Sequence, residues 1–474
     1  MSTSPGICWF RQDLRLHDNP ALLAAIDCGE VLPVFILDDD NAGNWKCGSA
    51  ARLWLHHSLN ALQKSLEGRL SIHRGRAEDI IPRLCRDHQS TRVFWNRCYE
   101  PWRFERDKEI KKRLQEQSID AQSFNGSLLW EPWQIMKKDG TPYKVFTPFY
   151  KSARTNANAT PAVPLPVPDN IPLMRKDSDG LTVDDLKLRP DHPWCEKIER
   201  HWRIGEENAQ IVLEEFIEAK IDHYNHGRDF PAEKGTSRLS PHLHFGEISP
   251  RQVWERASEV GFDDNIEVFK SELGWREFSY YLLYHFPRMP YDNLKSKFDR
   301  FPWWLNEQWL KRWKQGMTGV PFVDAGMREL WQTGHMHNRV RMIVASFLVK
   351  NLLIDWRHGA AWFWDCLVDA DLASNSASWQ WVAGCGTDAA PFFRIFNPVT
   401  QGQKFDPDGI YTRHFVPELK ELPSKYLFSP WNAPQTTLEQ AGVRLGDSYP
   451  CPLVDIQQSR QKALDALKKV SSSS

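Results

Sequence analysis

The segment 235–240 (GTSRLS) is rich in hydroxyl side chains and comes just before a predicted helix. Backbone N–H groups at a helix start have no partner within the helix, and together with the helix dipole they favour a bound anion. The same segment is also compatible with a capped helix that binds nothing. Two interpretations therefore stay open here, a phosphate site and a plain helix cap.

Three residues of the segment 272–278 (ELGWREF) fall on one side of a predicted helix. Glu272, Trp275 and Arg276 stand at positions i, i+3 and i+4, which share a helical face. A carboxylate, a stacking ring and a guanidinium suit ligand binding as well as an ion pair that lines a core. Gly274 costs about 1 kcal/mol relative to alanine in a helix interior. We therefore expect its missing side chain to allow a close approach, such as that of a ligand.

The segment 335–342 (HMHNRVRM) repeats this spacing with Asn338, Arg341 and Met342. An amide, a cation and a polarizable thioether suit a ligand that is partly polar and partly aromatic. His335 and His337 are two residues apart and cannot share a helical face as zinc ligands would, so we expect no metal site there.

Asp369 and Asp371 form a D-x-D pattern, which can hold a divalent metal when other ligands support it. The sequence offers no such ligand set, and a carboxylate–guanidinium pair with Arg341 is the simpler interpretation. The chain also contains 22 tryptophans. They could build an aromatic core, or they could handle a flat ligand or an electron, and composition alone does not choose.

The elements that must position these residues change character along the chain. Apolar segments in the first 130 residues predict strands, and amphipathic segments between them predict helices, one of which has Ser49 as N-cap. The predicted strands are 7–10, 31–37, 70–73 and 93–95, and the clearest helix after them is 105–117. This alternation predicts an α/β doubly wound parallel sheet, which binds ligands at the carboxyl ends of its strands. Neither G-x-G-x-x-G nor G-x-x-x-x-G-K-[ST] is present, so we expect no nucleotide site of those two types.

A proline-rich stretch, 155–193, separates this part from the rest and predicts an extended surface linker. Helical periodicity dominates after it, which predicts an all-α C-terminal domain. Its predicted helices are 207–225, 250–260, 265–285, 323–332, 337–353 and 359–367. We expect a domain at 1–130, a linker at 131–200 and a helical domain at 201–474.

The charge balance limits the classes of function. Sixty Lys and Arg residues face 61 Asp and Glu residues, for a net charge of −1. A uniformly basic coat for nucleic acid is therefore excluded, whereas a local basic patch is not. No apolar stretch reaches the ~18 residues of a membrane span, and the first residues do not resemble a secretory signal. Nine scattered cysteines without a C-x-x-C pair predict free thiols in a reducing cytosol.

Several longer motifs, in the right order, resemble those of the photolyase/cryptochrome family, and of its class I-type bacterial members in particular. These motifs are WFRQDLRLHDN at 9–19, GTSRLSP at 235–241, WREF at 275–278, MHNR at 336–339, DLA at 371–373, FNP at 396–398 and KFD at 404–406. The resemblance implies an α/β antenna-chromophore domain and an all-α domain that holds FAD. It also implies a carbon–carbon lyase, a deoxyribodipyrimidine photo-lyase. By this resemblance, excited reduced FAD (FADH−) would give an electron to a cyclobutane pyrimidine dimer in DNA, the ring would open and the electron would return.

The resemblance also implies roles for individual residues. The FAD contacts would be Tyr224, Thr236, Ser237, Arg238, Leu239, Ser240, Glu272, Arg276, Asn338, Arg341, Asp369, Ala370, Asp371 and Asn375. The catalytic pocket for the lesion would consist of Glu272, Trp275, Asn338, Met342 and Trp381. The electron path that reduces FAD would run through Trp303, Trp356 and Trp379. DNA contacts would come from Arg228, Trp275, Arg276, Arg339, Arg394, Gln401 and Lys404.

Other expectations concern the antenna, the partners and the alternatives. The antenna stays open between methenyltetrahydrofolate and a deazaflavin, because 100–103 lacks the Asn-Glu pair of well-known folate-binding members. We expect a cytoplasmic monomer that works at the bacterial nucleoid and needs no protein partner. A blue-light photoreceptor (cryptochrome) is the first alternative, and (6-4) photoproduct repair is disfavoured by Asn338, where that branch typically has His. A flavin-free DNA-binding protein is the second alternative. It would leave three polar groups without a ligand, namely 236–240, Arg341 and the pair Asp369 and Asp371.

Overall fold

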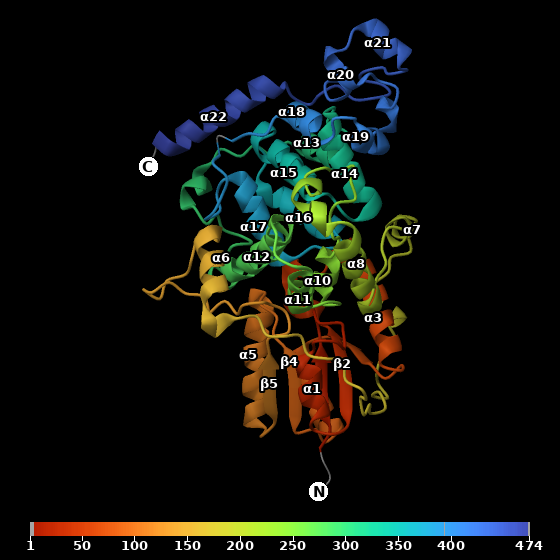
Figure 1. Ribbon diagram of the computed structural model, residues 1–474, viewed down its shortest axis with the longest axis vertical. Helices are drawn as coiled ribbons and strands as arrows, with labels where there is room; N and C mark the ends of the chain where they lie inside the picture. Colours follow the sequence, from red (N-terminus) through yellow and green to blue (C-terminus); the bar gives the residue numbers. More distant parts are fainter. Residues whose placement is uncertain (1–3, 393, 473–474) are drawn as a thin grey trace. The chain divides into compact units, whose positions relative to one another are not determined.

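The computed structural model describes residues 4–392 and 394–472 (Figure 1). Its N-terminal part holds a five-stranded sheet with the order β3-β2-β1-β4-β5, and every adjacent pair is parallel. The strands are β1 (Gly6–Phe10), β2 (Val31–Leu37), β3 (Ser71–Arg74), β4 (Arg92–Asn96) and β5 (Asp120–Phe124). The predicted fold class is thereby confirmed for this part, and β5 is an edge strand that the sequence pattern did not reveal.

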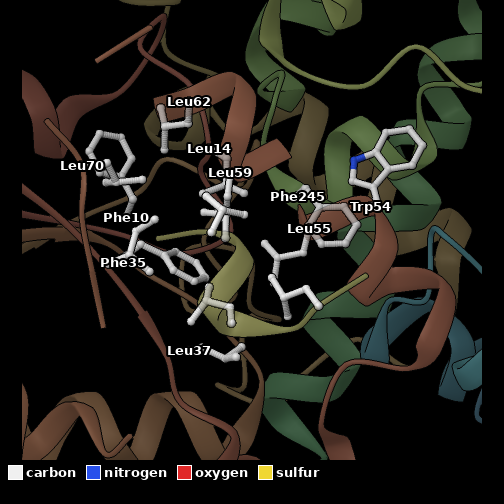
Figure 2. Packing of buried hydrophobic residues seen from close by; sticks show 14 of the residues in the cluster. Phe10, Leu14, Phe35, Leu37, Trp54, Leu55, Leu59, Leu62, Leu70 and Phe245 are labelled. Carbon is white, nitrogen blue, oxygen red and sulfur yellow. The ribbon is translucent and has the colours of Figure 1, made fainter. Parts of the chain in front are cut away.

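Helices bury both faces of this sheet. They are α1 (Pro20–Ile26), α2 (Asp39–Ala42), α3 (Ser49–Ser65), α4 (Ala77–Asp87) and α5 (Pro101–Glu116). Along β1 the side chains alternate, with Ile7 and Trp9 in one core cluster and Cys8 and Phe10 in the other. Figure 2 shows the cluster that contains Phe10, which lies among leucines of α3. Burial on both faces explains why β2 reads as a continuous apolar run.

Two local expectations for this part need correction. The N-cap of α3 is Gly48, and Ser49 is already the first helical residue. The stretch 155–193 is extended, but it is more than a surface linker. It forms single bridges to the sheet at Leu173 and Leu181, and its apolar residues Val183, Leu186 and Leu188 enter the core cluster.

Beyond the sheet, the chain after residue 200 is helical, as predicted, and the expected linker 131–200 also contains two α-helices, Phe146–Thr155 and Trp194–Glu199. The α-helices beyond the sheet are α6 (Phe146–Thr155), α7 (Trp194–Glu199), α8 (Glu206–Ala219), α9 (Tyr224–Gly227), α10 (Ser240–Phe245), α11 (Pro250–Val260), α12 (Asp264–His285), α13 (Glu307–Lys314), α14 (Pro321–Thr333), α15 (Asn338–Ser346), α16 (Trp356–Cys366), α17 (Leu372–Ala383), α18 (Pro398–Phe405), α19 (Ile410–Phe415), α20 (Ser424–Leu427), α21 (Gln435–Gln440) and α22 (Ile456–Ser472). The predicted helix 337–353 is α15 followed by a π-helical turn, η6 (Phe347–Asn351). Within the described ranges, no helix is both long enough and apolar enough to cross a lipid bilayer.

The chain forms two compact units whose segments alternate along the sequence. Unit 1 comprises Met1–Asp222, Ser237–Pro287 and Val368–Ala373, and unit 2 comprises His223–Thr236, Arg288–Leu367 and Ser374–Ser474. Unit 1 therefore combines the sheet with α10, α11 and α12 and with the aspartates of the D-x-D pattern.

Candidate cofactor and substrate site

Unit 1 brings together two motifs that lie far apart in the sequence. The hydroxyl of Ser240, the first residue of α10, donates to Oδ2 of Asp369 over 2.7 Å. Asp371, two residues further on, accepts a hydrogen bond from the hydroxyl of Tyr280 on α12. Oδ2 of Asp371, the oxygen that accepts from Tyr280, also lies 3.5 Å from Nδ1 of His244. The hydroxyl-rich segment and the aspartate pair therefore belong to one polar cluster, and both carboxylates are buried.

The backbone before α10 is shaped for close approach. Arg238 has a φ of +58°, in the left-handed region, and the N-cap residue Leu239 provides no side-chain cap for the helix amides. In unit 2, a Cβ on Gly235 would lie 2.7 Å from the backbone of Gly227 at the end of α9. This contact fixes Thr236 near the helix that carries Tyr224. Uncapped amides after hydroxyl side chains fit a phosphate group, so these residues suit an anionic ligand.

The face of α12 that the sequence indicated is half-buried. Trp275 stacks on Phe146 of α6 with ring centroids 3.8 Å apart and an angle of 11° between the planes. A Cβ on Gly274 would lie 2.5 Å from a ring carbon of Tyr150, which is also on α6. The missing side chain of Gly274 therefore makes room for α6, and the expectation of a ligand at this position is corrected. Because Phe146 holds one face of Trp275, the indole is a fixed platform for a flat group.

Three residues of this cluster were missed by the sequence analysis, namely His244, Glu277 and Tyr280. Nη1 of Arg276 donates to Oε1 of Glu277 over 2.8 Å. Oε2 of Glu277 accepts from the backbone N–H of Leu129 at 2.7 Å and of Trp130 at 3.2 Å. Burial raises the pKa of Glu277 to about 7 despite these partners. For Tyr280, the one available signal was its i, i+4 spacing from Arg276.

In unit 2, the start of α15 is anchored by the buried carboxylate of Glu329. This carboxylate accepts from the hydroxyl of Tyr411 at 2.7 Å and from the backbone N–H of His337 at 3.2 Å, and Nδ1 of His335 lies 3.4 Å from it. His337 is the N-cap, and burial lowers its pKa to about 4. Asn338 is the first residue of α15 and is exposed. Because His337 before it is anchored to Glu329, the backbone of Asn338 has a fixed position at the surface.

The other sequence-predicted residues of α15 have definite surroundings. The guanidinium of Arg339 pairs with Asp229 and lies 4.5 Å from the ring centroid of Phe405. Nε of Arg341 donates to the carbonyl oxygen of Met336 over 2.6 Å. Met342 is half-buried. Unit 2 contains these residues and unit 1 contains Asp369, so the expected pair of Arg341 with Asp369 stays a prediction.

Three further predicted residues lie in buried surroundings of unit 2. Nδ2 of Asn375 donates to the carbonyl oxygen of Ala360 over 3.0 Å, which turns the amide oxygen away from that partner. Trp379 is buried and meets Phe363 edge to face at 5.0 Å between centroids. Gly359 gives it room, since a Cβ there would lie 2.1 Å from the indole. Nε1 of Trp356 donates to Oδ1 of Asn293 over 3.0 Å.

The remaining predicted residues are nearer the surface of unit 2. Trp303 packs on Phe301 at 4.3 Å between centroids, and Trp381 is half-buried. Arg394 and Lys404 are exposed, while Arg228 and Gln401 are half-buried. Arg394 and Lys404 are therefore available to a polyanion.

A pocket opens at the carboxyl ends of β1 and β2, as the parallel-sheet rule predicts. The space between its walls amounts to about 580 Å³ when the open solvent at its mouth is included. Trp45 and Trp102 contribute flat walls, and Arg103 lies with its guanidinium 4.5 Å from the ring centroid of Trp102. Asp38 and His244 also line the pocket. The arrangement suits a planar ligand with polar substituents.

Comparison with known proteins identifies relatives over the whole chain. Residues 6–169 match the family model described as DNA photolyase, and residues 269–469 match the one described as the FAD binding domain of DNA photolyase. The deoxyribodipyrimidine photo-lyase of Agrobacterium fabrum is 48% identical over 99% of both chains. A crystal structure of a bacterial class III photolyase from Agrobacterium tumefaciens has a TM-score of 0.95 at 48% identity, covering 100% of this chain and 98% of that one. Cryptochrome-2 of Arabidopsis thaliana is 38% identical over 98% of this chain and 78% of the relative.

Proposed function

Because this chain belongs to the photolyase/cryptochrome family, we propose that it repairs cyclobutane pyrimidine dimers in DNA under light, with FAD as its cofactor. The observation that carries the proposal is the buried cluster in which Ser240 binds Asp369 and Tyr280 binds Asp371, next to the half-buried polar face of α12. The similar photo-lyase of Agrobacterium fabrum supports the reaction type. The similar crystal structure is named class III, and we propose that subclass for this chain where its motifs suggested class I-type.

The residues around this cluster fit FAD. Tyr224 and 236–240 would hold the pyrophosphate and the ribityl chain through hydroxyl groups and the uncapped amides before α10. Asp369 and Asp371 would face the flavin ring, with Arg341 balancing their charge. Asn375 would offer an amide oxygen that accepts a hydrogen bond and cannot act as a ready acid. Reduced FAD supplies the photochemistry when it is bound, which is the reversible transfer of one electron to the lesion under light.

The chain's own residues would bind and orient the lesion. Glu272 and Asn338 would form hydrogen bonds with the pyrimidine edges, and Trp275 and Trp381 would give flat walls, with Met342 filling the space beside them. A damaged step costs less to unstack than an intact one, so the dimer can turn out of the helix into such a pocket. Trp303, Trp356 and Trp379 would carry the electron that reduces FAD.

We also propose that the pocket at the carboxyl ends of β1 and β2 holds the antenna chromophore, either methenyltetrahydrofolate or a deazaflavin. Trp102 and Trp45 would flank its ring system. Extraction and absorbance of the chromophore that copurifies with the chain would distinguish the two.

A blue-light photoreceptor is the second candidate function, because cryptochrome-2 is also similar to this chain. The chain spans 78% of that relative and 99% of the Agrobacterium photo-lyase. The lesion-binding set with Glu272, Asn338 and Met342 favours repair over signalling. Asn338 in place of His favours cyclobutane dimers over (6-4) photoproducts.

The test is repair by the purified protein with reduced FAD. It is mixed with an oligonucleotide that carries one cyclobutane thymine dimer, illuminated with blue light, and followed by recovery of thymine absorbance against a dark control. We expect light-dependent recovery. Glu272→Ala should lower repair roughly tenfold and keep FAD bound, because it removes one charged hydrogen-bond partner of the lesion.

Glu267→Ala is the matched control, since Glu267 is also on α12 but pairs with Arg154. It should repair at the rate of the unmodified chain. Absence of recovery with reduced FAD bound would contradict the proposal and direct the test to (6-4) photoproducts first and to signalling second. Equal repair by Glu272→Ala would remove Glu272 from the pocket.

A further inference from the structure

Tyr280 is a buried residue of α12 that none of the functional roles above includes. Its side chain is 4% exposed, and its hydroxyl donates to Oδ2 of Asp371. His244 of α10 approaches the same oxygen from another helix, with Nδ1 at 3.5 Å. One oxygen of this carboxylate therefore has two neighbours from two helices, which leaves the carboxylate little freedom to rotate.

The phenol itself is held by the surrounding side chains. The guanidinium of Arg276 lies 4.9 Å from the centroid of the Tyr280 ring, and Glu277 fixes that guanidinium through Nη1. Tyr99 packs edge to face against the same ring, with centroids 6.3 Å apart. Burial and the negative charge of Asp371 raise the pKa of Tyr280 well above its ordinary value. The hydroxyl therefore keeps its proton at neutral pH and donates to the carboxylate.

We propose that Tyr280 is a positioning residue, which fixes the orientation of Asp371 and offsets part of its charge at the flavin ring of FAD. The inference rests on the proposed FAD site, because it needs Asp371 to face the flavin. A carboxylate near the ring disfavours added negative charge on the flavin, and a donated hydrogen bond reduces that effect. Tyr280 therefore raises both the affinity for FAD and the midpoint potential of the bound flavin.

The test compares Tyr280→Phe with Tyr281→Phe. Both variants lose one hydroxyl from a buried tyrosine of α12. The hydroxyl of Tyr281, however, accepts from the backbone N–H of Tyr143 at 2.9 Å and donates to Sδ of Met136 at 3.7 Å, away from Asp371. Two quantities are measured on each purified holoprotein, the dissociation constant of FAD and the midpoint potential of the bound flavin by spectroelectrochemistry. Thermal melting followed by circular dichroism reports whether each variant is folded.

We expect Tyr280→Phe to raise the dissociation constant of FAD roughly tenfold, as for the loss of a hydrogen bond to a charged group, and to shift the midpoint potential to a more negative value. Tyr281→Phe should change neither quantity. Asp371→Asn serves as the reference for loss of the charge and should shift the potential in the positive direction.

The outcomes separate this inference from the proposed function. If Asp371→Asn shifts the potential and Tyr280→Phe matches the unmodified chain, the role of Tyr280 is wrong while the FAD site stands. If Tyr281→Phe shifts affinity and potential as much as Tyr280→Phe, the effect is one of helix packing and the role is equally wrong. If the unmodified chain binds no FAD, the proposed function and this inference fail together.

Discussion

The side chain of Lys350 is fully buried in η6, and its Nζ donates to the carbonyl oxygen of Arg394 over 2.9 Å. Burial, and after it the charge of Arg394, lowers the pKa of Lys350 to about 7. A lysine in the unfolded chain has a pKa of about 10.4. Since the neutral amine can still donate to a carbonyl, the contact does not require the charge, and the residue holds the segment before α18 in place.

This residue gives the unfolding free energy a dependence on pH. Between pH 7 and pH 10 the unfolded state binds more protons at this lysine than the folded state, so stability rises as the pH rises through this window. Lys350→Met removes the group. We expect the stability of the unmodified chain relative to Lys350→Met to increase by up to about 4 kcal/mol across the window. Urea unfolding at several pH values measures it.

Lys420→Met is the control, because Lys420 is exposed. Its stability should follow that of the unmodified chain at every pH. Parallel pH profiles for Lys350→Met and the unmodified chain would show that Lys350 has an ordinary pKa in the folded state.

At the residue scale, the sequence drew attention to residues of unusual type in unusual spacing and missed those that act through a partner. The pattern drew attention to Glu272, Asp371 and Asn338, whose roles stay predictions. Tyr280 carried only the weak signal of its i, i+4 spacing from Arg276, because a tyrosine in a largely buried helix looks like any core residue. Its partner Asp371 lies 91 positions further along the chain, and the fold alone decides that the two meet.

At the scale of elements, the contact of α12 with α6 depends on Gly274. Alanine is the better helix former there by about 1 kcal/mol, so helix propensity alone predicts that Gly274→Ala stabilises the protein. The Cβ, however, would lie 2.5 Å from the ring of Tyr150, which is itself stacked on Phe146 at 5.2 Å between centroids. We expect a net loss of about 1–3 kcal/mol, because overpacking outweighs propensity. The melting temperature measures it.

The background variant Tyr150→Ala separates the two effects. In that background the added methyl group has room, and Gly274→Ala should then be neutral or stabilising. An equal loss in both backgrounds would place the cause outside the contact with Tyr150.

Most elements were predictable, and the errors have physical reasons. The helix 250–260 and the strand 31–37 match α11 and β2, since caps and apolar runs mark their ends. β5 escaped because its sequence DAQSF is polar and it lies at the sheet edge. The predicted helix 207–225 divides after Ala219, where Lys220 leaves helical geometry with a φ of −135°. Such a break depends on packing, and periodicity does not record it.

At the scale of the whole molecule, the predicted limits 1–130, 131–200 and 201–474 follow changes in sequence character, and they stay a prediction. Contacts between residues distant in the sequence instead connect the helices α10, α11 and α12 with the part of the chain that holds the sheet. Arg251 pairs with Asp18 at 2.9 Å, and Arg15 donates to the carbonyl oxygen of Gly246, also at 2.9 Å. No local pattern in the sequence reports such pairs, so they were found only in the structure.

The charge of the whole chain governs how it can bind DNA. With a net charge of −1, attraction to phosphates must come from a few local cations. Arg394 and Lys404 are exposed candidates. Each contact with a phosphate releases condensed counterions, so binding weakens as salt increases, and loss of one contact reduces the slope of log K against log salt by about 1.

We therefore expect Arg394→Ala and Lys404→Ala each to lower that slope by about 1 and to weaken binding of damaged and undamaged duplex alike. Fluorescence anisotropy in the dark, from about 50 to 200 mM salt, measures the slope. Lys112→Ala on α5 is the control, because Lys112 is equally exposed but outside the proposed DNA contacts. If Lys112→Ala lowers the slope as much as the other two, the attraction comes from the overall charge and the assigned contacts are wrong. If only the two site variants lower it, a nearly neutral protein binds a polyanion through a local patch.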